Sequence, residues 1–275
     1  PDDKPELIVL PRWNALTTIK YLRKKCKSDT TGAFGQSIPE DPGYTFFENT
    51  DGHHFVTISD LISQPITDDQ KLWLITDKKN PEFNVDTVQN FTILNHINLL
   101  KNYISHQFGS KITYYDIQEG TLEDQTYELS DYYNNTYNVG KWMLWNKELY
   151  YPELEPDWEK FTQTYKLPSF VDVKESGIYD FLWNQRMNLL GQNRLEVMTA
   201  LNLRRKVGDM INFSIRGFSG ESHKTISGNY LITDMIHLFS LDKQSFQTKY
   251  TLAKDSYNLM EAETKKITEF VNKLK

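Results

Sequence analysis

Three segments near the C-terminal end alternate apolar and polar residues in the two-residue period of β-strands, and this feature constrains the fold most. They span residues 209–216, 229–239 and 246–253. Residues 217–228 and 240–245 connect them, so the simplest topology is an antiparallel meander.

Asp234 and His237 stand three residues apart in the middle segment, which raises the question of an acid/base pair. Strand alternation sends them to opposite faces, and general acid/base catalysis needs both groups within hydrogen-bond reach of one reacting group. The face of Asp234 is predicted to consist of Tyr230, Ile232, Asp234, Ile236 and Leu238. The face of His237 is predicted to consist of Leu231, Thr233, Met235, His237 and Phe239.

Helical spacing and capping residues predict four helices elsewhere in the chain. One covers residues 13–26, with Asn14 as a candidate N-cap, and a short one starts at Ser59, which is its candidate N-cap. A long helix is predicted over residues 176–200, with Gly191 as the point where it would break. The C-terminal residues are predicted to form an amphipathic helix that would contact a partner through Ile267, Phe270, Val271 and Leu274.

Further strands are predicted before the long helix. Residues 44–48 and 53–58 flank Asp51-Gly52, a typical hairpin turn. Residues 72–76 resemble a buried strand, whereas residues 88–100 fit a helix or a strand pair equally well. Residues 111–166 are predicted to form extended segments and long loops, because prolines interrupt any long helix there.

Composition narrows the function classes. A formal net charge of -6 argues against sequence-specific nucleic-acid binding, which depends on Lys and Arg neutralising phosphates. The one cysteine, Cys26, allows neither an internal disulfide nor a multi-thiolate metal site, and its spacing predicts a packed thiol on a helix. The sequence shows no apolar window of membrane-spanning length and no signal-peptide pattern. It begins at Pro1 without a methionine, which indicates processing or a further upstream region.

Candidate chemical sites have simpler explanations. His53 and His54 are adjacent on a predicted strand, so they point apart and do not form a metal site together. The acids Glu119, Glu123, Asp124, Glu128 and Asp131 include no spacing diagnostic of glycoside cleavage. A dense aromatic stretch fits either a sugar- or protein-binding surface or the core of a loop-rich subdomain; it comprises Tyr132, Tyr133, Tyr137, Trp142, Trp145, Tyr150 and Tyr151. We therefore expect no catalytic residue, no metal and no cofactor.

Residues 207–259 resemble the final tube-forming domain of the central baseplate hub protein of T-even-type contractile-tailed phages. The family pattern Gly-x-x-Ile-x-Phe is met by Gly208, Ile211 and Phe213. The family pattern of the next strand is Tyr-x-Val/Ile-x-Asp/Glu-x-Ile-His-x-Leu/Phe-Ser. It is met by Tyr230, Ile232, Asp234, Ile236, His237, Phe239 and Ser240. Upstream, PRWNALTTIKYLRKKC and GYTFFENTDGHHFVTISDLISQP resemble the inserted domain of that family, and SGIYDFLWNQRMNLLGQNRLEVMTALNL resembles its helical return. Residues 65–173 show no match.

The resemblance implies an α+β fold, with an antiparallel β tube-forming domain at the C-terminal end and a mixed helix/hairpin inserted domain. We expect residues 1–175 to form the inserted domain with the aromatic region, residues 176–258 the returning helix and tube domain, and residues 259–275 the C-terminal helix. The family has a first tube domain ahead of this region, so a longer gene product or an unseen N-terminal part is expected. Strand packing and subunit contacts are expected at Ile211, Phe213, Tyr230, Ile232, Ile236, Leu238, Phe246, Tyr250 and Leu252.

The implied role is structural and not enzymatic. The resemblance implies a homotrimer whose pseudo-sixfold ring adapts the hexameric tail tube to a trimeric central spike. The expected partners are further copies of the chain, the spike, a tube or tube-initiator protein and surrounding baseplate proteins. The expected location is the tail baseplate of a virion assembled in the host cytoplasm, without a membrane anchor, and the genome would pass through the channel. Two alternatives stay open: a carbohydrate-binding or carbohydrate-cleaving virion protein, and the hub of a type VI secretion or other contractile injection system.

Overall fold

The computed structural model describes most of the chain from the first helix to the last strand. The described residues are 12–23, 26, 43–75, 86–95, 109–116, 120–128, 136–140, 142–143, 162–167, 173–216, 226–242 and 244–257. The predicted C-terminal helix with Ile267, Phe270, Val271 and Leu274 lies outside them. The fold is α+β, as predicted.

A six-stranded sheet forms the centre of the fold, in the order β3-β10-β11-β12-β9-β4. Its strands are β3 (Lys71–Ile75), β4 (Val88–Asn95), β9 (Arg194–Ala200), β10 (Met210–Arg216), β11 (Gly228–Ser240) and β12 (Ser245–Ala253). β10, β11 and β12 pair antiparallel in sequence order, which confirms the predicted meander. β3 joins β10 in parallel. The backbone N–H of Trp73 donates to the carbonyl of Asp86 at 3.0 Å, so the sheet curls until its two ends meet. We call it the curled sheet.

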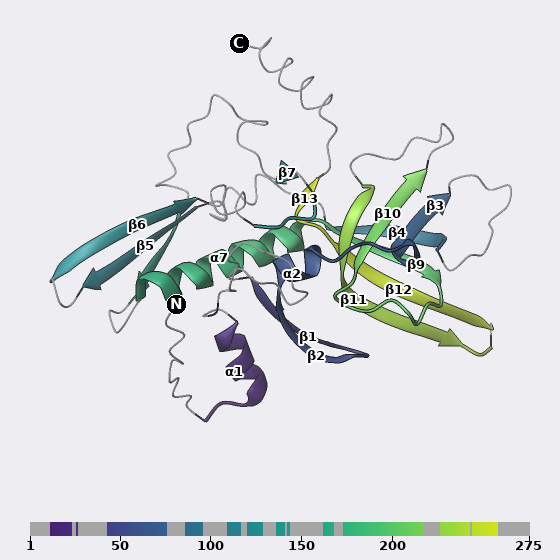
Figure 1. Ribbon diagram of the computed structural model, residues 1–275, viewed down its shortest axis with the longest axis horizontal. Helices are drawn as coiled ribbons and strands as arrows, with labels where there is room; N and C mark the ends of the chain where they lie inside the picture. Colours follow the sequence, from purple (N-terminus) through teal and green to yellow (C-terminus); the bar gives the residue numbers. More distant parts are fainter. Residues whose placement is uncertain are drawn as a thin grey trace, which may run out of the picture.

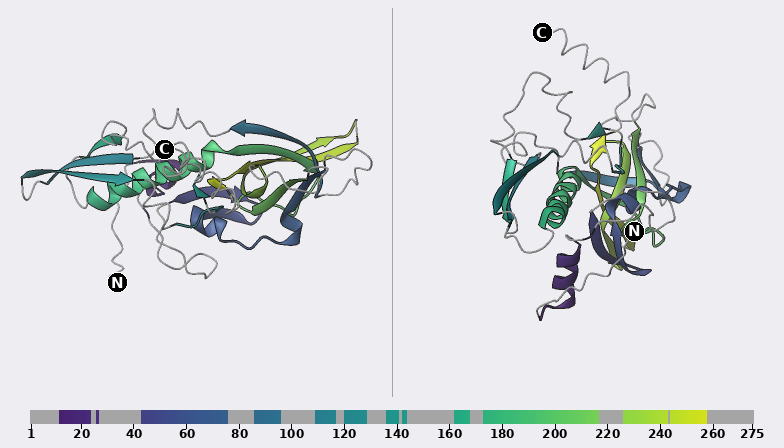
Figure 2. Two further views of the ribbon diagram at one scale, coloured as in Figure 1. Left: turned by 90° about the horizontal axis from the view of Figure 1, so that it is seen from above. Right: turned by 60° about the vertical axis from the view of Figure 1, so that its left-hand side comes forward.

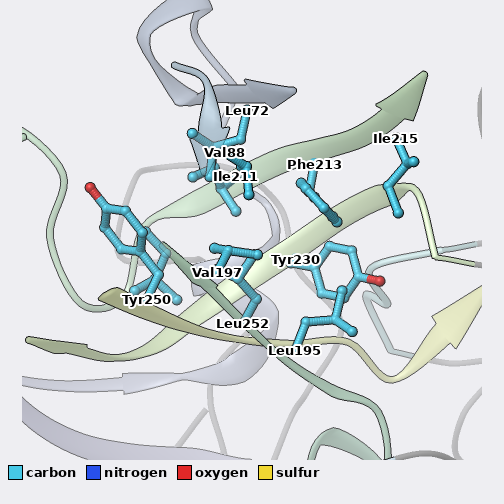
Figure 3. Packing of buried hydrophobic residues seen from close by; sticks show 11 residues of the cluster. Leu72, Val88, Leu195, Val197, Ile211, Phe213, Ile215, Tyr230, Tyr250 and Leu252 are labelled. Atoms are coloured by element: carbon cyan, nitrogen blue, oxygen red, sulfur yellow. The ribbon is translucent and has the colours of Figure 1, made fainter. Parts of the chain in front are cut away.

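The inner face of the curled sheet holds the main core (Figure 3). Leu72, Val197, Phe213, Tyr230 and Leu252 are each fully buried there. Burying one such side chain stabilises the fold by about 1.5–3 kcal/mol, so this cluster makes a substantial contribution to stability. Apolar residues thus alternate toward the inside, as a half-buried strand requires.

Two predictions about secondary structure need correction. The long helix, α7 (Val173–Gln192), ends before Arg194, and the residues predicted to continue it form strand β9. Leu195, Val197 and Thr199 alternate into the core between β12 and β4, and this burial outweighs the helix propensity of the neighbouring Leu, Glu and Met residues. For residues 88–100, the described part is strand β4, which overturns the helix; residues 96–100 lie outside the described residues.

The curled sheet takes β3 and β4 from the region expected to form the inserted domain. The sheet is therefore not built from residues 176–258 alone. The division of the chain at residues 175 and 258 stays a prediction.

Smaller elements surround the outer face of the sheet. The predicted hairpin is β1 (Tyr44–Asn49) and β2 (Gly52–Thr57), and α2 (Ile58–Ile62) follows it. Thr57, not Ser59, caps α2 by accepting from the backbone N–H of Asp60 at 3.1 Å. A short 3-10 helix, η1 (Asp68–Gln70), leads into β3.

Helix α7 crosses the middle of the molecule and separates two groups of strands (Figures 1 and 2). On one side lies the curled sheet. On the other lies a three-stranded sheet of β5 (Gly109–Asp116), β6 (Thr121–Glu128) and β8 (Thr162–Leu167), so the predicted extended segments of this region exist. The two-residue strands β7 (Trp142–Met143) and β13 (Ser256–Tyr257) pair antiparallel in a separate small sheet, and β13 follows directly after β12 in the chain.

Helix α1 (Ala15–Leu22) matches the predicted N-terminal helix over a shorter range. The side chain of Asn14 accepts from the backbone N–H of Thr17 at 2.8 Å, which confirms the predicted cap.

Candidate assembly surface

A β-bulge in β11 decides which side chains this surface presents. Ile232 lies opposite Leu252 on β12, but Asp234 already lies opposite Thr251, so Thr233 is the extra residue. One extra residue inverts the alternation that follows it. The side chains that face inward are therefore Tyr230 and Ile232 before the bulge, and Met235 and His237 after it.

The bulge overturns the prediction that Ile232, Ile236 and Leu238 pack on one face. Ile232 is in the core, whereas Ile236 is 52% exposed and Leu238 is 41% exposed on the outer face. The alternation in the sequence predicts a regular strand through Thr233, and no residue type at that position signals an inserted residue.

Asp234 and His237 do lie on opposite faces, as predicted. Asp234 forms an ion pair with Arg194 on the outer side, at 3.0 Å between Oδ2 and the guanidinium. His237 Nδ1 lies 3.0 Å from the hydroxyl of Thr248, a residue of the inner face. Neither contact joins the two groups, so the pair does not form an acid/base site.

Beyond the bulge, β11 and β12 extend past β10 and form what we call the projecting hairpin, residues 234–251 (Figure 1). β10 pairs with β11 only from Gly228 to Leu231, and the backbone of Ile232 makes the last contacts, with Gly208 and Asp209. The projecting hairpin carries exposed apolar side chains on both of its faces. Ile236 and Leu238 lie on the outer face, Phe239 and Phe246 lie on the side of Met235 and His237, and Leu241 lies in the turn. Exposed apolar side chains gathered in this way are typical of an interaction surface.

The nine residues predicted for strand packing and subunit contact fall into two sets. Six are buried in the curled sheet: Ile211, Phe213, Tyr230, Ile232, Tyr250 and Leu252. Three are exposed on the projecting hairpin: Ile236, Leu238 and Phe246. The structure thus divides one predicted set into a core and a surface. Sequence reasoning did not select Phe239 and Leu241, which are 60% and 81% exposed, although both are large apolar residues beside a predicted turn.

An apolar pocket of about 230 Å³ lies on the outer face of the curled sheet. Phe47 of β1, Leu61 of α2, Leu190 of α7 and Leu231 of β11 line it. Gly208 lines it too, with φ +94°, and a Cβ on this residue would approach the ring of Phe47 to 2.5 Å. Glycine is therefore required here both for its backbone conformation and for the ring that packs on it.

A buried polar network fixes the segment of residues 136–140 against α7 and the end of β12. The guanidinium of Arg186 donates to the carbonyl of Tyr137 and to the side chain of Asn138, and it lies 3.3 Å from the carboxylate of Asp255. Asp255 also accepts from the backbone N–H of Val139 at 3.0 Å. Arg186 and Asp255 are 1% and 0% exposed, so each compensates the burial of the other. This network has a structural role.

Lys254 is the described residue whose charge is most affected by burial. Desolvation lowers its pKa to about 7, and its ammonium lies 4.6 Å from the centre of the Tyr230 ring. An amine that loses its proton near neutral pH is consistent with a position at the edge of the main core.

The histidine pair forms no metal site. His54 Nε2 lies 2.8 Å from the amide oxygen of Asn49, while His53 stacks on Phe46 near Glu48 on the other face of the hairpin. Among the described residues, no three His, Cys, Asp or Glu side chains come close enough to hold an ion.

Few side chains of the acidic run between Glu119 and Asp131 belong to the described part of the structure. Asp124 on β6 is exposed and accepts from the hydroxyl of Thr113 at 2.6 Å, and Glu119 and Asp131 lie outside the described residues. Of the aromatic stretch, the side chain of Tyr137 is described, and it is 41% exposed. No helix in the described parts of the chain has the length and apolar content to cross a bilayer.

Comparisons with known proteins add two structural likenesses. No family model matches the chain, and no curated protein matches it in sequence. The tail protein from Neisseria meningitidis MC58 has a TM-score of 0.46 at 10% identity, covering 91% of this chain and 57% of that one. The 43 kDa tail protein of prophage MuSo2 from Shewanella oneidensis has a TM-score of 0.40 at 10% identity, covering 78% of this chain and 50% of that one. The chain spans about half the length of these proteins.

Proposed function

We propose that this chain is a structural protein of a contractile phage tail, a wall segment of the central baseplate hub. In this proposal three copies form a pseudo-sixfold ring between the hexameric tail tube and the trimeric central spike. The chain contributes the curled sheet as wall and the projecting hairpin as contact surface.

The observation that carries the proposal is the position of the residues that resemble the hub family. Gly208 has a left-handed backbone and lies under Phe47, while Ile211, Phe213 and Tyr230 are fully buried in one antiparallel meander. The family pattern therefore coincides with the residues on which this sheet depends. The exposed apolar side chains of the projecting hairpin further support a role in assembly.

Light scattering after size-exclusion chromatography tests the proposal. We expect a particle of three chains, each of 32.4 kDa, that binds the spike protein encoded beside it. A chain that stays monomeric up to high micromolar concentration and binds no such spike would contradict the hub. Sugar release from cell-wall material, lost in Glu123→Gln or Glu128→Gln, would instead establish the carbohydrate-cleaving alternative.

A further inference from the structure

The apolar pocket on the outer face of the curled sheet is large enough to receive a side chain. Besides the residues named above, Ile58 of α2 and Met187 of α7 line it, and so does Ala253 at the end of β12. An apolar cavity of about 150 Å³ stays free of water and can hold a molecule of the size of benzene. At about 230 Å³, this pocket therefore has room for one large apolar side chain.

Gly191 leaves space at this pocket that no described side chain uses. It lies in the last turn of α7 and lines the pocket, and a Cβ on it would meet nothing within 4 Å. Its φ is not among the positive values of the described glycines, so its backbone does not require glycine, in contrast to Gly208. Within a helix, glycine is less favourable than alanine. The described contacts therefore give no reason for glycine here, whereas an occupant of the pocket would.

The chain passes this pocket shortly before it leaves the described residues. Ala253 lines the pocket, and Tyr257, four positions later, is the last described residue. An extended chain covers about 3.3 Å per residue, so residues 258–266 can span up to about 30 Å, which is about the diameter of a small domain. The residues that follow can therefore return to the pocket of their own chain.

The segment after residue 266 has an apolar face that requires a partner. Its apolar side chains recur at i, i+3, i+4 and i+7, the spacing of one helix face: Ile267, Phe270, Val271 and Leu274. A helix shorter than about 12–15 residues is marginal in water unless its apolar face packs on another surface. Recognition of a helix by a groove uses this same spacing of anchor residues. Phe270 is the largest of the four and matches the volume of the pocket.

We propose that residues 267–274 pack as a helix on the outer face of the curled sheet of their own chain, with the ring of Phe270 in the pocket. This arrangement explains Gly191, because a side chain at that position would compete with the ring for the same space. The inference goes beyond the proposed hub function and does not rest on it, since the contact lies within one chain.

Limited proteolysis of the full chain by trypsin tests the contact. Trypsin cleaves after Lys265 and Lys266, which directly precede the proposed helix, so packing should slow these cleavages. Gly191→Phe fills the pocket from α7, and Phe270→Ser removes the anchor. Each variant should raise the rate of cleavage after Lys265 and Lys266 at least about tenfold. Cleavage after Lys249 of β12 should stay at the wild-type rate, which shows that the sheet is intact.

Phe246→Ser is the matched control for Phe270→Ser, because it removes a phenylalanine that is 46% exposed on the projecting hairpin. It should leave cleavage after Lys265 and Lys266 unchanged. The inference would be overturned if the wild-type chain were cleaved there as fast as Phe270→Ser, or if Gly191→Phe were protected as well as the wild type.

Disulfide trapping in a Cys26→Ser background identifies the chain to which the segment binds. Gly191→Cys is combined with Phe270→Cys and, because the register is open, with Ile267→Cys. At least one of these double variants should form a disulfide within one chain under mild oxidation, visible as a monomer of increased mobility on a denaturing gel. The control combines Gly191→Cys with Asn272→Cys, which lies on the opposite side of the helix and should not link.

Each other outcome of the trapping contradicts the inference. A disulfide between two chains would show that the segment binds a second copy. Equal linkage of the control would show random collisions of the segment with the pocket, and the absence of any link in the two double variants would show that the segment lies elsewhere. A link within a chain that stays monomeric in light scattering would contradict the hub function and leave this inference standing.

Discussion

Replacement of Gly208 by alanine should destabilise the protein through two separable effects. The first is backbone strain, because φ is +94° and L-residues rarely adopt it; this costs about 1–3 kcal/mol. The second is steric, because the new Cβ would approach two ring carbons of Phe47 to 2.5 and 2.8 Å; overpacking of this kind costs about 1–3 kcal/mol. We therefore expect a loss of about 2–6 kcal/mol in the free energy of unfolding.

Gly52 provides a matched control for the strain alone. Its φ is +126°, and a Cβ there would meet nothing within 4 Å, so Gly52→Ala should cost only about 1–3 kcal/mol. Urea unfolding followed by far-UV circular dichroism measures both variants through the midpoint and the m-value.

A double-mutant cycle then isolates the contact with the ring. Phe47→Ala should remove part of the cost of Gly208→Ala, giving a coupling free energy of about 1 kcal/mol or more. The reasoning would be refuted if Gly208→Ala cost no more than Gly52→Ala, or if Phe47→Ala left the cost of Gly208→Ala unchanged.

Three further outcomes follow from burial and charge. Phe213→Ala, at a fully buried ring, should cost about 3–5 kcal/mol in urea unfolding, whereas Phe246→Ala, at 46% exposure, should cost less than about 1 kcal/mol. Asp255→Ala leaves a buried arginine without its carboxylate and should cost about 3–5 kcal/mol, while loss of the exposed Asp234 ion pair should cost about 0–1 kcal/mol. The pKa of Lys254 is about 7 in the folded protein against an ordinary 10.5, so between these pH values the unfolded chain binds more protons and stability should rise with pH. Thermal melts from pH 7 to pH 10 measure this rise, which Lys254→Met should abolish; an equal slope in both proteins would contradict the assignment.

Local features of the sequence were sufficient for the meander, the turn of the first hairpin and the cap of α1. The alternation of residues 209–253 corresponds to β10, β11 and β12, Asp51-Gly52 turns the first hairpin, and Asn14 caps α1. In each case the signal lies within a few residues of the feature. The reason is that strand alternation, turn conformation and capping depend on neighbouring residues.

Only part of the candidate assembly surface could be predicted from the sequence, because the face on which its side chains lie depends on contacts between two strands. Ile236 and Leu238 were correctly placed on a strand and wrongly placed on the same face as Ile232, because a bulge at Thr233 depends on how β11 meets β12. The role of these residues in subunit contact stays a prediction.

The sequence by itself determined where apolar and polar residues alternate, where the chain turns and that no sequence motif for chemistry is present. The tertiary structure decided which strands are neighbours: it turned residues 194–200 from predicted helix into β9, and it brought β3 and β4 into the same sheet as the C-terminal meander. It also decided that β11 extends past β10, so that residues 234–240 have no partner strand on that side among the described residues. These features depend on contacts between residues far apart in the chain, whose burial outweighs local preference.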